Sequence, residues 1–259
     1  MSSRGAMTDS STASTPSEAG RGCVFVTTHW SLVLSAGRSD STRAQNALAQ
    51  LCQTYWYPLY AYARARGHSR EDAQDLTQEF FARLLAHDWV GKADRAKGRF
   101  RSFLLTAMKR FMAGEWDKAR AQKRGGGAPL LPLPFDTAET RWSREPADRL
   151  TPEDCFERRW VMTLLEEVLK RLRAEYEAEG NAGLFSEIHP CLVGERAALP
   201  YSELAGKLGL SESAVKSAVH RLRRRYRKLL RQEIAQTVAA PGEVDEELRH
   251  LFAVLGKTG

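Results

Sequence analysis

The sequence predicts an all-α protein of two helical domains joined by a flexible linker, with a helix-turn-helix in the second domain. Apolar residues recur at intervals of three and four through most of the chain, which is the period of an amphipathic helix. The run GGGAPLLPLP, residues 125–134, breaks this pattern and is typical of a linker. The expected division is a disordered tail (1–26), a first domain (27–124), a linker (125–150), a second domain (151–236) and a C-terminal extension (237–259).

Composition limits the class of protein. The chain of 259 residues carries a formal net charge of +7, which favours a polyanionic partner. No stretch approaches the roughly 20 apolar residues of a membrane helix, and the N-terminal tail lacks the apolar core of a signal peptide. We therefore expect no membrane segment and a cytoplasmic location.

The residue types that carry chemistry are sparse. The four cysteines are dispersed without C-x-x-C spacing, so we expect buried thiols rather than a metal site or a redox motif. We find no Gly-rich phosphate loop and no nucleophile with a credible base. We expect no cofactor, no metal and no catalytic residue.

In the first domain, short helical patterns follow one another. A helix is expected at residues 28–37; a β-strand over CVFVTT, residues 23–28, is the alternative, although no partner strand is evident nearby. The helical pattern over residues 41–67 is expected to restart at Pro58, since proline is tolerated only in the first turn of a helix. Ser69 to Asp72 forms a capping box. The helix that it starts is expected to bury Ala73, Leu76, Phe80 and Leu84, with Thr77, Phe81 and Leu85 beside them. Its other face is acidic and can be simply solvated or can meet a protein partner.

The segment of residues 99–124 mixes cations with aromatic residues. Single-stranded nucleic acid requires this combination, because cations contact its backbone and rings stack on its bases. The alternative is that Phe111 and Trp116 are core residues beneath a basic rim. In the second domain, Thr151 and Pro152 open a strongly amphipathic helix as its cap and first residue.

The most informative stretch is residues 202–234, in which two helices meet at a tight turn. Ser202 is the expected N-cap of the first helix, and Gly209 suits the left-handed conformation that often ends a helix. Ser211 or Ser213 can cap the second helix. The apolar positions of that helix are Val215, Val219 and Leu222. This arrangement is typical of a helix-turn-helix, whose second helix enters the DNA major groove.

The second of these helices carries a dense row of cations. Residues 216–231 contain eight Lys or Arg residues and no acid. Like charges at helical spacing repel one another unless anions share the site, and phosphates supply such anions. A solvated basic helix is the alternative, but we favour DNA binding. The residues expected on the outer face are Ala214, Lys216, Ser217, His220, Arg221, Arg223 and Arg224.

Three segments in this order resemble bacterial sigma factors of the extracytoplasmic-function type. They are REDAQDLTQEFFARLL (70–85), GRFRSFLLTAMKRF (98–111) and YSELAGKLGLSESAVKSAVHRLRRR (201–225). Residues 42–124 resemble the promoter-melting domain of that family, and residues 151–234 resemble its upstream-element-binding domain. The resemblance implies a non-catalytic subunit that recruits RNA polymerase core enzyme to promoters for DNA-templated transcription initiation.

The resemblance also implies residue roles and partners. The residues implied to dock on the polymerase clamp helices are Asp72, Asp75, Gln78 and Glu79. Those implied to capture a flipped base of the downstream promoter element are Arg110, Phe111 and Met112, and those implied to support the separated strand are Lys109, Trp116 and Arg120. Those implied to read the upstream element are Lys216, Ser217, His220 and Arg221, with Arg223, Arg224 and Arg225 on phosphate. The implied partners are promoter DNA, RNA polymerase core and, as is usual in such families, an anti-sigma factor.

Two other interpretations remain. A helix-turn-helix transcriptional regulator with a helical N-terminal sensor domain explains the basic second domain but leaves residues 99–124 unexplained. A helical enzyme would need a chemical centre, and the best acid pair, Asp72 and Asp75, lies in an ordinary helix start. The amphipathic C-terminal extension is expected to pack on the second domain.

Overall fold

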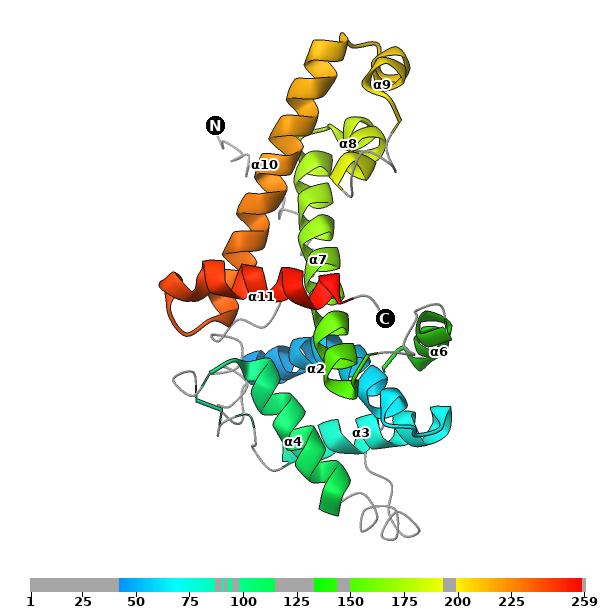
Figure 1. The fold of residues 1–259 in the computed structure, drawn as a ribbon, viewed down its shortest axis with the longest axis vertical. Helices are drawn as coiled ribbons and strands as arrows, with labels where there is room; N and C mark the ends of the chain where they lie inside the picture. The colour runs from blue at the N-terminus through cyan, green and yellow to red at the C-terminus, as the bar shows by residue number, and fades with distance from the viewer. Residues whose placement is uncertain are drawn as a thin grey trace, which may run out of the picture.

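The computed structural model consists of helices wherever regular structure is described (Figure 1). The described residues are 42–86, 90, 93–94, 98–114, 133–143, 150–192 and 199–257. The prediction of an all-α fold is confirmed. The helix predicted at residues 28–37 lies outside the described residues. Within the described residues, no helix combines the length and the apolar character that crossing a bilayer demands.

Helix α2 (Thr42–Ala65) is continuous, so the predicted restart at Pro58 is wrong. A proline inside a helix removes a backbone hydrogen bond and is unfavourable by about 3 kcal/mol. Here the residues on both sides of the proline are buried, and their packing outweighs that loss. The buried neighbours are Tyr55, Trp56, Tyr57, Leu59, Tyr60, Ala61, Tyr62 and Ala63. The chain then turns at Gly67, whose φ of +89° is readily adopted only by glycine.

Helix α3 (Arg70–Ala86) contacts both α2 and α4 (Phe100–Gly114). The N-cap of the predicted capping box is confirmed, because the backbone N–H of Asp72 donates to Ser69 Oγ at 3.0 Å. The predicted apolar face is also confirmed, because Ala73, Leu76, Phe80 and Leu84 are buried, and Thr77 and Phe81 are buried beside them. The side chain of Leu85 lies outside the described residues. Helix α4 contributes the buried side chains of Phe100, Leu104, Leu105, Met108 and Phe111.

The predicted linker, residues 125–150, contains helix α6 (Phe135–Ser143). Phe135 and Ala138 lie one helical turn apart and are both buried. The ring of Phe135 packs edge-on against Trp56 of α2, with ring centroids 5.5 Å apart. This part of the stretch is therefore helical and docked rather than extended, because its apolar residues at helical spacing gain burial against α2.

Helix α7 (Pro152–Ala178) is the element on which both halves of the fold pack (Figure 1). Thr151 is its N-cap, as predicted, and accepts a hydrogen bond from the backbone N–H of Asp154 at 3.1 Å. One end of α7 lies against α2, and the other lies against α8 and α10. Its buried side chains are Cys155, Phe156, Arg159, Trp160, Val161, Leu164, Val168 and Leu172. The hydrophobic core is consequently continuous from α2 to α10.

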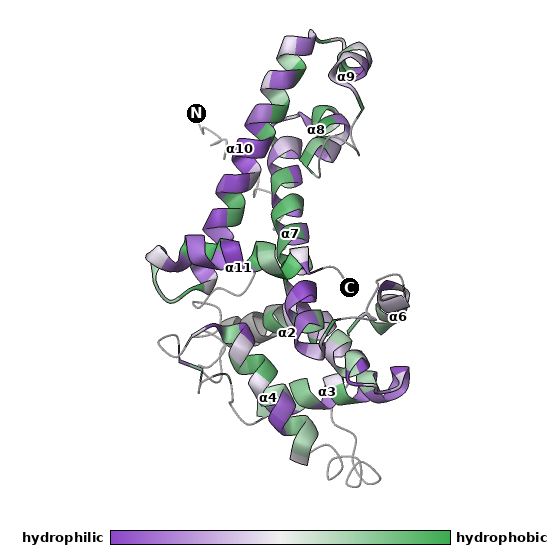
Figure 2. Ribbon diagram, in the orientation of Figure 1, coloured by the Kyte–Doolittle hydropathy of each residue, from purple (hydrophilic) through white to green (hydrophobic). Residues whose placement is uncertain are grey.

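The second half of the chain is built around α7. It comprises α8 (Ala182–Ile188), the 3-10 helix η4 (His189–Leu192), α9 (Tyr201–Leu208) and α10 (Glu212–Thr237). Helix α10 runs beside α7, and Figure 2 shows hydrophilic residues along its length, interrupted by hydrophobic ones. The apolar side of α10 is covered by α7 and η4, so its charged side faces outward.

The C-terminal extension forms the 3-10 helix η6 (Pro241–Glu243) and helix α11 (Val244–Gly256). Helix α11 crosses α7 and α10, which confirms the prediction that the extension packs on the second half (Figure 1). It also reaches the first half, because the carboxylate of Glu247 lies 2.5 Å from Arg99 Nη2 and 2.6 Å from Arg101 Nη1.

These ion pairs belong to a buried charge cluster that joins α4, α7 and α11. Arg101 and Glu247 are both buried, and Arg101 Nε donates to Glu157 of α7 at 2.8 Å. The Arg101 guanidinium also lies 4.3 Å from the ring centroid of Trp160. Burial by itself lowers the pKa of Arg101, but the charges of Glu157 and Glu247 outweigh it and the pKa is raised. The cluster thus keeps Arg101 charged in the interior.

Candidate nucleic-acid interface

Helices α9 and α10 meet at the tight turn that the sequence predicts. Gly209 ends α9 in the left-handed conformation, with φ +64° and ψ +29°. Ser211 is the N-cap of α10, and its Oγ accepts a hydrogen bond from the backbone N–H of Ala214 at 3.2 Å. The predicted N-cap Ser202 is wrong, because α9 begins at Tyr201 and the extended Pro200, two residues before Ser202, takes the cap position.

The first half of α10 separates an apolar side from a polar side. The predicted apolar positions Val215, Val219 and Leu222 are each at most 1% exposed. On the other side, Lys216 pairs with Glu212 one turn earlier, with 2.8 Å between Nζ and Oε1. The exposed residues predicted to meet DNA are Lys216, Ser217, His220, Arg221 and Arg224. Their side chains can hydrogen-bond both base edges and phosphates.

The three predicted phosphate-binding arginines of α10 lie in different environments. Arg223 donates from Nε and Nη2 to the backbone carbonyl of Cys191, at 3.2 and 2.9 Å. Arg225 makes a two-pronged pair with Glu175 of α7, with both donor–acceptor distances at 2.7 Å. Arg224 is exposed. Arg223 and Arg225 therefore hold α10 to its neighbours in this structure, while Arg224 is presented to solvent.

The acidic residues predicted to meet polymerase lie on α3. Asp75 is exposed, whereas Asp72, Gln78 and Glu79 are half-buried. Asp72 belongs to the capping box, and Glu79 accepts a hydrogen bond from Arg83 Nε at 3.1 Å. Asp75 is therefore the member of this group that offers the most accessible charge to a partner.

Of the residues predicted to bind the downstream element, those that the structure describes lie in the last turns of α4. Lys109 and Arg110 are exposed, and Met112 is half-buried. Trp116 and Arg120 lie outside the described residues, so their roles stay predictions. The described part of this surface is cationic, with one thioether beside the two charges.

Phe111 lies in the core rather than on this surface. Its side chain is 1% exposed, and its ring centroid lies 5.8 Å from that of Phe80. The guanidinium of Arg83 covers the ring, 5.5 Å from its centroid. Phe111 lies on the side of α4 that faces α3. For this residue, the structure therefore agrees with the alternative prediction of a core side chain beneath a basic rim.

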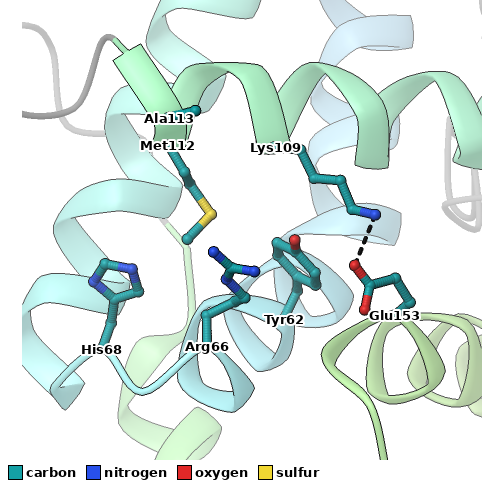
Figure 3. Close-up of a pocket in the computed structure, with 7 residues that line it drawn as sticks. All are labelled: Tyr62, Arg66, His68, Lys109, Met112, Ala113 and Glu153. Carbon is teal, nitrogen blue, oxygen red and sulfur yellow. Dashed lines mark ion pairs between the residues drawn. The ribbon is translucent and has the colours of Figure 1, made fainter.

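A pocket of about 280 Å³ lies between the end of α2, the end of α4 and the first turn of α7 (Figure 3). Its lining includes Tyr62, Arg66, His68, Lys109, Met112 and Glu153. Lys109 Nζ lies 2.7 Å from Glu153 Oε1, and the hydrogen bond from this lysine lowers the pKa of Glu153. Basic side chains outnumber acidic ones in this lining, so the pocket favours an anion.

Most of the residues that line this pocket could not be predicted from the sequence. The order Arg66, Gly67, His68 places two basic side chains around a turn, which is a weak signal available in the sequence. Glu153 is identified there only as an acid in the first turn of a helix, where it suits the helix dipole. Its approach to Lys109 depends on the docking of α7 against the first half.

Three of the four cysteines lie in the described part of the chain. Cys52, Cys155 and Cys191 are buried free thiols, as predicted, and Cys23 lies outside the described residues. In the part of the chain that the structure describes, no group of three or more His, Cys, Asp or Glu residues could hold a metal ion.

Comparison with known families gives one match, which lies in the first half of the chain. Residues 51–122 match the family model described as Sigma-70 region 2, which spans most of α2 and all of α3 and α4. No curated protein and no solved structure gave a match. The match shows that this part of the chain is similar to region 2 of sigma-70 factors.

Proposed function

We propose that this protein is a sigma factor of the extracytoplasmic-function type, which binds RNA polymerase core in the cytoplasm and directs initiation at specific promoters. The observation that carries the proposal is the Sigma-70 region 2 match over residues 51–122. The paired helices α9 and α10 support it from the other half of the chain. A sigma factor needs both a region that engages the polymerase and opened DNA and a region that recognises duplex DNA.

Recognition of the upstream element is assigned to the exposed face of α10. Ser217 and Arg221 are exposed on its second and third turns, where side chains of a docked helix can reach base edges. Arg224 lies further along the helix and suits a phosphate contact. This amounts to a helix-turn-helix in which Arg223 and Arg225 stabilise the fold and the exposed residues contact DNA.

Engagement of the polymerase and of the downstream element is assigned to the first half. Asp75 presents an exposed carboxylate for the polymerase core. Lys109, Arg110 and Met112 form the described part of the downstream-element surface, and Trp116 and Arg120 are proposed to extend it. Phe111 is proposed to support this surface from beneath rather than to stack on a base.

A regulator with an N-terminal sensor domain is less well supported, because a sensor domain is not expected to match the Sigma-70 region 2 family model. The two proteins would also behave differently with polymerase. A sigma factor allows the bare core enzyme to start at a promoter, whereas a regulator needs a holoenzyme that already contains another sigma factor.

The direct test is runoff transcription on genomic fragments with polymerase core as the only other protein. Discrete transcripts that depend on the added chain are the expected result, and their absence with active core would refute the proposal. Arg221→Ala should lose about 1–3 kcal/mol of discrimination for the promoter that these transcripts define. Arg249→Ala, which removes an exposed arginine of α11, is the matched control.

Polymerase binding is tested separately. Asp75→Lys should weaken the complex with core by about tenfold, because it reverses a charge at an electrostatic contact. Glu246→Lys makes the same charge change at an exposed position of α11 and should leave the affinity unchanged. Equal affinities for both variants would remove Asp75 from the proposed contact.

A further inference from the structure

We propose that the pocket between α2, α4 and α7 is a binding site for a nucleotide phosphate, and that Glu153 occupies it as the phosphate's competitor in the free protein. The inference rests on the proposed function, since it concerns the surface that would meet separated DNA. It adds residues that the sequence does not assign to that surface, namely Arg66, His68 and Glu153.

The basic side of the pocket comes from two elements that the fold fixes in place. Arg64 Nη1 donates to the backbone carbonyl of His68 at 2.7 Å, which anchors the turn after α2. That turn places Arg66 and His68 beneath the end of α4, from which Lys109 and Met112 project (Figure 3). A phosphate in this space would meet cations from both helices.

The acidic side comes from α7 and belongs to the other half of the chain. Glu153 Oε1 lies 2.7 Å from Lys109 Nζ and forms an ion pair with it (Figure 3). A bound phosphate oxygen would accept the hydrogen bond of Lys109 at the same place. The lysine and glutamate side chains are 44% and 42% exposed, so water already screens the pair. A pair of this kind is weak and can exchange partners.

The remaining lining adds apolar surface that can contact the sugar next to the phosphate. The Tyr62 ring and the Met112 thioether give the pocket apolar surface beside its charges. Its volume of about 280 Å³ is small. This is near the lower end of the range of about 300–1,000 Å³ for small-molecule sites, which suits a single small group better than a large ligand.

Competition with Glu153 would couple nucleotide binding to the position of α7. A phosphate that takes Lys109 removes the ion pair between the first turn of α7 and the end of α4. Conversely, while the start of α7 stays docked, Lys109 remains paired with Glu153. Binding at the pocket and loosening of the start of α7 should therefore favour each other.

The experiment measures fluorescence anisotropy of a labelled single-stranded oligonucleotide with the full-length protein. Glu153→Gln should tighten binding by about two- to fivefold, because it removes a weak competitor. Glu177→Gln, an exposed glutamate elsewhere on α7, is the matched control and should not change the affinity. Equal affinities for Glu153→Gln and the wild type would overturn the role of Glu153.

Salt dependence identifies direct binding of a phosphate, which a merely structural effect would not imitate. On a single strand, the slope of log K against log salt is smaller by about 0.7 for each phosphate that the protein no longer neutralises. Arg66→Ala and Lys109→Ala should each show this reduction, whereas Arg249→Ala should keep the wild-type slope. Unchanged slopes for the first two variants would overturn the site.

Competitors identify the source of the phosphate. Displacement of the oligonucleotide by AMP in a manner that depends on Arg66 would assign the site to a free nucleotide, whereas displacement only by unlabelled strand would assign it to nucleic acid. Displacement by a poly-glutamate peptide alone would overturn the nucleotide assignment. Runoff transcription by the Arg66→Ala protein separates the pocket from the sigma-factor proposal. If this variant still gave promoter-dependent transcripts and its oligonucleotide binding kept the wild-type salt slope, the pocket would be refuted and the sigma-factor function would stand.

Discussion

Replacing Glu247 removes the carboxylate that ties α11 to the start of α4. Its side chain is fully buried and pairs with Arg99 and Arg101, of which Arg101 is 1% exposed. Breaking a buried ion pair by removing one partner is unfavourable by about 3–5 kcal/mol. Arg99 is 32% exposed and can turn to water, and Arg101 keeps Glu157, so we expect a value near the lower end of that range for Glu247→Gln.

Urea denaturation followed by far-UV circular dichroism measures this loss. A loss of about 3 kcal/mol in a protein of this size corresponds to a fall of about 6–12 °C in the melting temperature. The control is Glu246→Gln, which changes an exposed neighbour on α11 and should lower stability by less than about 0.5 kcal/mol. A loss below about 1 kcal/mol for Glu247→Gln would match a surface pair and would refute the buried cluster.

A double-mutant cycle separates the pair from the helix packing around it. The double variant Arg101→Met/Glu247→Leu should be more stable than the sum of its single losses predicts, by about 0.5–3 kcal/mol, because neither partner leaves the other uncompensated. Additive losses would show that the two side chains do not interact in solution.

Three further predictions concern individual side chains. Phe111→Ala should lower the free energy of unfolding by about 3–5 kcal/mol, because it empties a core position; a loss below about 1 kcal/mol in urea denaturation would place the ring at the surface instead. Burial raises the pKa of Cys52 to about 12, so at pH 8 only about one thiol in ten thousand is ionised, and iodoacetamide should label it rapidly only after unfolding; rapid labelling of the native protein, located by peptide mass spectrometry, would contradict this. Arg224→Ala should weaken duplex binding and lower its salt slope by about 0.9, whereas Arg225→Ala should mainly lower stability by about 1 kcal/mol; the reverse pattern would show that the pair with Glu175 opens on DNA.

The features that could be predicted from the sequence are those that short segments decide. The capping box from Ser69 to Asp72, the Thr151 cap and the Gly209 turn each depend on residues within one or two helical turns, and the structure contains all three. The apolar faces of α3 and α10 follow from the helical period alone. The acidic and basic character of the candidate site could also be predicted, because the charge of a segment follows from its residues alone.

Features that depend on the packing of distant segments could not be predicted. Pro58 remains inside α2 because the aromatic residues around it are buried, which outweighs a local rule. Arg223 and Arg225 flank Arg224 in the sequence, but these two donate to acceptors on η4 and α7, whereas Arg224 is exposed. Sequence reasoning therefore treated three residues as equivalent that packing makes different.

By itself, the sequence determined the helices, the caps, the turn between α9 and α10 and the basic character of the chain, because hydrophobic period, capping hydrogen bonds and charge are local. Only the tertiary structure decided that Phe111 is buried, that Glu153 faces Lys109 and that Glu247 meets Arg101. Each of these arrangements depends on where helices distant in the sequence dock. Docking is governed by the burial of side chains summed over the whole core, which no single segment encodes.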